Sequence, residues 1–299
     1  MYFLSTPKFW RCPPQNTKEI TMVRIISDTS TMYSEAEGQA MGIYIAPLSV
    51  TISGESYREL TDIQTPAFID LINQGGIPTS SQPSIGDVLD LYQKYPNDQI
   101  LDIAMADGLS GTYNSACTAA TMTEHPENIT VINSKTLCGP HRYMVEKAHE
   151  MAVAGASLEE ILSWLQVRID NSWSYLMPND FDYLRRGGRL SPLVASMGKI
   201  LNLVPVMTLT EDCKQLISHA KKRSVPKAVQ AVIDHLKTKG VDTNHKFYIS
   251  HAQAPDFAKQ AKQALIQAFG DIDVEILMLT PAFTTQGGPK CFAIQTVLK

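Results

Sequence analysis

The most informative absence in this sequence is that of a long apolar run. Nothing in it approaches the roughly 18 uninterrupted apolar residues of a membrane-spanning helix. The segment 1–21 contains no apolar stretch of the roughly 7 to 15 residues that a signal peptide requires. We therefore expect a cytoplasmic protein without stable membrane insertion, in which residues 1–21 form an N-terminal extension.

Positive charge is also scarce. The chain carries 26 lysines and arginines against 30 aspartates and glutamates, and its formal net charge is −4. Binding to nucleic-acid phosphates normally requires positive side chains clustered on one face. The sequence therefore predicts no nucleic-acid partner.

Cysteine is rare and scattered. The spacing matches neither a Cys-x-x-Cys motif nor a Cys/His ligand set, so we expect no zinc site, no other metal and no cofactor. The odd number of cysteines argues against a disulfide framework and favours free thiols in a reducing cytoplasm. The five cysteines are Cys12, Cys117, Cys138, Cys213 and Cys291.

The composition is that of a globular protein of two domains. Hydrophobic residues make up 44% and charged residues 19% of 299 residues, which is ample for a sizeable core. The length is about twice a typical domain of roughly 150 residues. Two domains are therefore the natural expectation.

Short β-branched runs alternate with amphipathic stretches from Val23 onward, a pattern typical of parallel sheets covered by helices. Residues 22–172 are predicted to form a first α/β domain with a mainly parallel sheet. Its expected strands are 23–27, 43–52, 100–105 and 129–132, and its expected helices are 65–73, 84–95, 110–122 and 139–154. A further helix over 157–169, with a capping box of Ser157 and Glu160, bridges to the second domain.

Residues 173–299 are predicted to form a second α/β domain. The Glu211-Asp212 pair lies between two expected strands and indicates a hairpin, so this sheet should be mixed. Its expected strands are 173–177, 204–209, 215–218, 246–250, 274–279 and 292–297, and its expected helices are 226–237 and 254–269.

Small hydroxyl residues gather at three strand-to-helix turns, 27–31, 78–84 and 107–113. In open α/β sheets ligands bind outside the carboxyl ends of the strands. Hydroxyls and free backbone N–H groups at the start of a helix suit a carboxylate or a phosphate. Helix capping alone also explains any single one of these loops.

Two of these turns permit an enzymatic alternative, a hydrolase or phosphotransferase that uses Asp28 or Ser110. Ser110 lacks the second glycine of a nucleophile elbow, and no His/Asp pair follows it in an evident triad pattern. Asp28 lacks the second acid that would act as acid or base. A structural polar turn is the better interpretation of both.

Three arginines surround the turn Gly187-Gly188. Arg186 and Arg189 are candidates for contacting an anion or an acidic partner. The alternative is an ordinary helix C-terminus, where glycine adopts the left-handed conformation and arginine complements the helix dipole. Both interpretations stay open.

These motifs, in this order, resemble the DegV family over nearly the whole chain from Val23. The segments 27–30 (Ser-Asp-Thr-Ser) and 80–84 (Ser-Ser-Gln-Pro-Ser) are similar to the family's Thr-Asp-Ser-Ser and Thr-Ser-Gln-Pro-Ser. Residues 109–113 reproduce its Leu-Ser-Gly-Thr-Tyr, and 184–191 resemble its Leu-x-x-Gly-Gly-Arg-Ile-Ser.

The resemblance implies two α/β domains with a ligand tunnel and cleft near their interface. A long-chain fatty acid would be buried there without any chemistry, and its carboxylate would be presented to a partner fatty acid kinase. By position, Ser80 and Ser110 would bind the carboxylate, with Ser81 and the backbone of Gly111 in support.

The chain departs from the family pattern at two places near this site. Ala106 and Asp107 stand where the family usually has two serines, and Gln286 stands where its His-x-Gly-Pro-Gly has the histidine. Gln286 at this position is the fifth predicted ligand contact. The changes also suggest a further hypothesis, a binder for another amphipathic anion.

Overall fold

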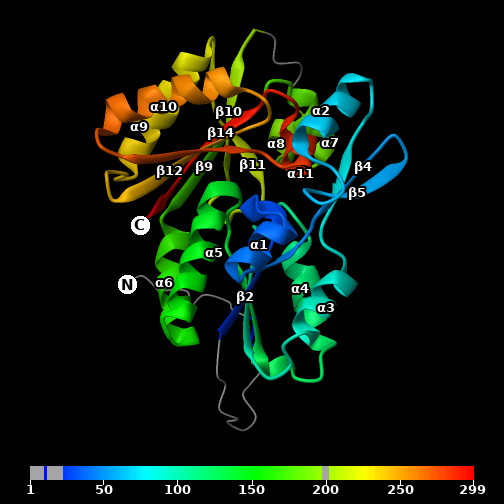
Figure 1. The fold of residues 1–299 in the computed structure, drawn as a ribbon. Helices are drawn as coiled ribbons and strands as arrows, with labels where there is room; N and C mark the ends of the chain where they lie inside the picture. Colours follow the sequence, from blue (N-terminus) through cyan, green and yellow to red (C-terminus); the bar gives the residue numbers. More distant parts are fainter. Residues whose placement is uncertain (1–9, 12–22, 197–201) are drawn as a thin grey trace.

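A computed structural model describes residues 10–11, 23–196 and 202–299. Two larger sheets and one small sheet organise this part of the chain (Figure 1). The predicted extension 1–21 lies outside the described residues except for Trp10–Arg11. No helix in the described ranges is long and apolar enough to cross a bilayer.

The first sheet has the strand order β1-β8-β7-β2-β3. Its four longer strands pair in parallel, and β1 adds to β8 in the antiparallel sense, so the prediction of a mainly parallel sheet is confirmed. The strands are β1 (Trp10–Arg11), β2 (Val23–Asp28), β3 (Tyr44–Ala46), β7 (Gln99–Ala104) and β8 (Ile129–Asn133).

Helices cover both faces of this sheet because successive strand residues point to opposite sides. Ile25 packs against α5 and α6, whereas Ile26 packs against α3 and α4. The helices on this sheet are α1 (Glu35–Met41), α3 (Ile85–Gln93), α4 (Thr112–Thr121), α5 (Cys138–Val153) and α6 (Leu158–Asp170), with 3₁₀ turns at Thr29–Thr31 and Pro126–Asn128. Helix α2 (Thr65–Asn73) lies apart from this sheet and packs on α11 (Figure 1).

The second sheet has the order β11-β10-β9-β14-β12-β13. Only β12 and β13 pair in parallel, so it is mixed, as predicted. Helices α9 (Val225–Thr238) and α10 (Pro255–Phe269) cover its outer face. The strands are β9 (Ser172–Met177), β10 (Val204–Leu209), β11 (Leu216–Lys222), β12 (His245–His251), β13 (Asp273–Met278) and β14 (Phe292–Leu298).

Helix α5 joins the two large sheets. It packs on β2 of the first sheet and on β12 and β14 of the second. Its side chains Met144 and Val145 are fully buried in a core that also includes Tyr248 of β12 and Val297 of β14. The two halves of the chain therefore share a core around this helix.

A small third sheet and three short helices lie beside the second sheet (Figure 1). The sheet has the order β5-β4-β6, with β4 (Ser49–Ile52), β5 (Glu55–Arg58) and β6 (Thr79–Ser81). The helices are α7 (Phe181–Gly187), α8 (Pro192–Ala195) and α11 (Pro281–Gly287).

The prediction of one strand over 43–52 is wrong. The segment forms β3 and β4, which belong to different sheets. Pro47 separates them because it has no N–H group to continue a strand ladder. The next amide, that of Leu48, donates instead to Thr29 Oγ1 at 3.0 Å.

The predicted helix starts are mostly confirmed. Ser84 accepts a hydrogen bond from the Asp87 amide at the start of α3, and Ser157 and Glu160 form the predicted capping box of α6. The helix expected over 110–122 starts later than predicted, because α4 begins at Thr112 after Gly111. This leaves the Ser110 side chain outside the helix.

Candidate functional site

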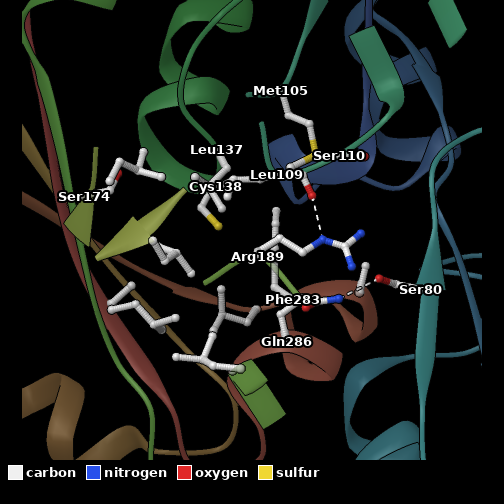
Figure 2. Close-up of a pocket in the computed structure, with 18 of the residues that line it drawn as sticks. Ser80, Met105, Leu109, Ser110, Leu137, Cys138, Ser174, Arg189, Phe283 and Gln286 are labelled. Carbon is white, nitrogen blue, oxygen red and sulfur yellow. Dashed lines mark hydrogen bonds between the residues drawn. The ribbon is translucent and has the colours of Figure 1, made fainter. Parts of the chain in front are cut away.

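A largely apolar cavity lies between the two halves of the chain. Its empty space amounts to about 940 Å³ when the part open to solvent is included. Figure 2 shows side chains from both halves of the chain converging on it. Its apolar lining comes mainly from Leu48, Met105, Leu109, Leu137, Leu176, Leu184, Leu209, Leu216, Leu279 and Phe283.

One end of the cavity is polar. Ser80 and Ser81 reach it from β6, and Gln82 follows directly. Ser110 reaches it from the loop before α4, and Gln286 from α11. The structure thus brings together four of the five residues that we predicted as ligand contacts.

The hydroxyl of Ser80 is oriented by Gln286. The side-chain Nε2 of Gln286 donates to Ser80 Oγ over 3.0 Å (Figure 2). Because Ser80 accepts this bond, its own hydrogen is available for another acceptor in the cavity. The Oε1 atom of Gln286 is buried and has no hydrogen-bond partner among the described residues.

Ser110 is held by the first residue of α4. Its Oγ atom lies 2.8 Å from Thr112 Oγ1 and accepts from the Thr112 amide at 3.3 Å. The side chain therefore stays at the N-terminal end of α4, where the helix dipole favours a negative ligand group.

Arg189 supplies positive charge at this end of the cavity. It is the one ionised side chain among the described lining residues. Its Nε donates to the carbonyl of Leu109 at 3.0 Å (Figure 2). Its Nη1 donates to the carbonyl of Gly187. These two bonds fix the guanidinium beside the loop that carries Ser110.

The glycine pair before Arg189 ends a helix. Helix α7 stops at Gly187, and Gly188 has φ +72°, the left-handed conformation that glycine adopts at lowest cost. The alternative of an ordinary helix C-terminus is therefore correct for Gly188, while Arg189 still turns into the cavity. Arg186 does not line it but lies 4.5 Å from the ring centre of Tyr183.

Two other candidates also lie outside the cavity lining. Gly111 sits beside the Gln82 side chain at the start of α4, and its role as a ligand contact stays a prediction. Asp28 is 1% exposed, and its carboxylate accepts from the amides of Ser30 and Met105 at 2.8 and 3.0 Å. The Asp28 carboxylate therefore has a structural role, in which it binds two backbone amides.

Asp107 faces the second half of the chain rather than the cavity. Its carboxylate pairs with Lys214, in the turn between β10 and β11. A Cβ atom on Gly108 would overlap the backbone of Lys214, so only glycine permits this approach. The ion pair with Lys214 thereby compensates the negative charge of Asp107.

Glu59 holds the N-terminal end of α11, which carries Gln286. The Glu59 side chain is fully buried, accepts from the Ala282 amide at 2.8 Å and accepts from the hydroxyl of Thr29. Burial raises the pKa of the Glu59 carboxyl to about 7, although both hydrogen bonds act in the opposite direction.

Sequence reasoning missed several cavity residues. Gln82 lies inside a segment that we singled out, but we gave it no role. Ser174 of β9 and Gln295 of β14 also line the cavity. The signal for Gln295 was present, since it is a lone amide in the otherwise apolar stretch 292–295.

The shape and lining of the cavity indicate the class of protein. An apolar cavity with a hydroxyl-rich, cationic end, enclosed between two sheets, is typical of a protein that binds a small amphipathic molecule. The chain belongs to the DegV family, because the model described as "Uncharacterised protein, DegV family" matches residues 22–299.

Individual relatives agree with this assignment. The DegV domain-containing protein lin2658 of Listeria innocua is 28% identical over 282 residues, covering 93% of this chain and 99% of that protein. The fatty acid binding DegV family protein SAG1342 of Streptococcus agalactiae is similar with a TM-score of 0.82 at 26% identity, covering 93% of this chain and 99% of that one. DegV of Bacillus subtilis, described as a fatty acid binding protein, has a TM-score of 0.81 at 25% identity with the same coverages.

Proposed function

We propose that this protein binds a long-chain fatty acid and presents the carboxylate to a partner fatty acid kinase. The observation that carries the proposal is the division of the cavity into a long apolar wall and one polar, cationic end. The similar proteins of Streptococcus agalactiae and Bacillus subtilis, both described as fatty acid binding, support the choice of ligand.

The affinity would come mainly from the acyl chain. Each methylene group removed from water contributes roughly 0.8 kcal/mol. Ser80 and Ser110 would donate to the carboxylate, and Arg189 would provide the nearby positive charge. Ser81 would add a further hydroxyl. The polar end therefore sets the orientation of the ligand more than its affinity.

The position of the polar end suits transfer to a partner. Ser81 and Gln82 are exposed, whereas the apolar wall is built from buried and half-buried side chains. A ligand held in this orientation keeps its carboxylate near the surface. Because a kinase partner uses ATP, the proposed function places the protein in the cytoplasm. We also propose that residues 22–172 and 173–299 are the two domains between which the ligand binds.

We propose a carrier rather than an enzyme because the candidate nucleophile has no base. The described hydrogen bonds of the Ser110 hydroxyl run to Thr112 and to no histidine or carboxylate. Asp28 is buried and bonded to backbone amides. An acyl transfer reaction would need an activated nucleophile at this place.

The deciding experiment is mass spectrometry of lipid extracted from the purified, folded protein. A fatty acid present in about equimolar amount is the expected result. An empty protein that also fails to bind added long-chain fatty acids contradicts the proposal.

The kinase step is tested separately. The loaded protein is mixed with a fatty acid kinase and ATP, and formation of acyl phosphate is followed. We expect product only when both proteins are present. Binding of fatty acid without any acyl phosphate would retain the carrier function and reject the partner.

A further inference from the structure

A second polar position lies in the cavity, away from the polar end described above. Ser174 and Gln295 face each other across strands β9 and β14, where they are direct partners in the ladder. Both line the cavity, and Gln295 is 2% exposed. In Figure 2, Ser174 and Ser80 lie on opposite sides of the view, so an extended ligand would pass between them.

The surroundings of this pair are apolar. The next residues on the same face of the sheet are Leu176 and Ala293, which pair with each other and also line the cavity. The two side chains therefore form an isolated polar spot in an apolar wall.

Because Gln295 donates to Ser174, the hydroxyl hydrogen of Ser174 is free to bond to another acceptor. Nε2 of Gln295 donates to the carbonyl of Leu137 and to Ser174 Oγ, both at 2.9 Å. A carbonyl can only accept, so the orientation of the amide is settled, and Ser174 must be the acceptor of the second bond.

No acceptor for the Ser174 hydroxyl hydrogen exists among the described hydrogen bonds. Gln295 Oε1 is instead approached by the hydroxyl of Ser250 at 3.5 Å. An unsubstituted acyl chain lying over Ser174 would exclude water and leave this donor without a partner, which carries a free-energy cost.

We propose that the Ser174–Gln295 pair is a subsite for an oxygen atom on the acyl chain. The ligand class is a long-chain fatty acid with a hydroxyl or oxo group remote from its carboxylate. The ligand oxygen accepts a hydrogen bond from the Ser174 hydroxyl. This inference rests on the proposed function and specifies the ligand more closely.

The test compares octadecanoic acid with octadecanoic acids that carry one hydroxyl at successive positions along the chain. Dissociation constants are measured by isothermal titration calorimetry with delipidated protein. The wild type should prefer a narrow set of hydroxyl positions. Ser174→Ala should weaken binding of those isomers about three- to tenfold, as expected for one hydrogen bond, without weakening binding of octadecanoic acid.

Two further variants serve as controls. Ser174→Thr retains a hydroxyl and should retain the positional preference. Ser172→Ala removes a hydroxyl from the same strand outside the cavity lining and should leave all the dissociation constants unchanged.

The outcomes separate this inference from the proposed function. Equal affinity for all hydroxyl positions in the wild type, or an equal loss for every acid in Ser174→Ala, overturns the subsite while fatty-acid binding stands. Failure of every acid to bind the wild type rejects the proposed function and the subsite with it.

Discussion

At the scale of single residues, the polar end of the cavity depends on which atoms still have hydrogens to donate. Ser80 accepts from Gln286, and Ser110 accepts from the Thr112 amide. Each hydroxyl can therefore direct its hydrogen toward a carboxylate. A bond from a neutral hydroxyl to a charged acceptor contributes more than one to a neutral acceptor.

Replacing Ser80 by alanine should weaken fatty-acid binding about tenfold, because one charge-assisted hydrogen bond is lost. The measurement is a fluorescence displacement assay with a long-chain fatty acid. Ser56→Ala, which removes a hydroxyl from β5 of the same small sheet, is the matched control and should bind like the wild type. An unchanged affinity in Ser80→Ala would show that the head group lies elsewhere.

Gln286→His should introduce a pH dependence that the wild-type side chain cannot have. Histidine is ordinarily protonated below about pH 6.5, and a positive charge beside Ser80 would favour the carboxylate. Fatty-acid affinity should therefore rise as pH falls below that value in the variant. The control is the pH dependence of fatty-acid affinity in the wild type. If affinity changes with pH in the same way in both proteins, residue 286 does not act on the carboxylate, and a different anionic ligand is favoured.

At the scale of elements, helix α11 is the link between a buried carboxyl and the cavity. Glu59 bonds to the Ala282 amide at the start of α11, and Gln286 lies near the end of the same helix. Burial raises the pKa of Glu59, so the folded protein disfavours the charged carboxylate relative to water.

The contribution of Glu59 to stability should decrease as pH rises. Its pKa is higher in the folded protein, about 7, than its ordinary value of 4.5. The favourable contribution is complete below about pH 4.5 and is lost as pH rises through about 7, a change of roughly 3 kcal/mol. Urea unfolding from pH 4.5 to 8 measures it.

Glu59→Gln provides the comparison, because the amide cannot ionise and can still accept from Ala282. Asp102 also has a pKa raised to about 7 by burial, so the wild type alone does not isolate Glu59. The difference between wild type and variant should shift in favour of Glu59→Gln as pH rises. A difference independent of pH would contradict the assignment.

Elements with a clear period or cap were predictable, and short ones were not. The capping box at Ser157 and the hairpin at Glu211-Asp212 both follow from local chemistry and are confirmed. Helices α1, α7 and α11 have seven residues each, too few to display an apolar period. The split at Pro47 could have been predicted from the missing N–H group.

At the scale of the whole molecule, the cavity belongs to neither half alone. Its lining runs from Leu48 to Gln295 in the sequence and uses the second sheet, the small sheet, loops of the first half and Cys138 at the start of α5. Two of the three hydroxyl-rich turns, 78–84 and 107–113, identified the polar end, because each gathers its polar side chains within a few residues of sequence. The apolar wall could not be predicted, because buried leucines look alike in sequence whether they face a ligand or a dry core.

Ligand binding should therefore stabilise both halves together. At a free ligand concentration of 100 times the dissociation constant, the stabilisation is roughly 2.7 kcal/mol. Thermal unfolding should show a higher midpoint with a long-chain fatty acid, and the gain should grow with chain length at fixed concentration until the cavity is filled. Octanol of equal concentration is the control for nonspecific apolar binding. A midpoint independent of chain length would rule out burial of the acyl chain.

The approach of Gly108 to the β10–β11 turn bears on how a ligand leaves. The ion pair between Asp107 and Lys214 spans the two halves beside the Ser110 loop, and the Lys214 side chain is half exposed. Dissolved salt screens such a surface pair, while buried apolar contacts are little affected. A higher ionic strength should consequently make it easier for the two halves to separate at this ion pair. It should therefore shorten the residence time of the ligand more than it lowers the equilibrium affinity.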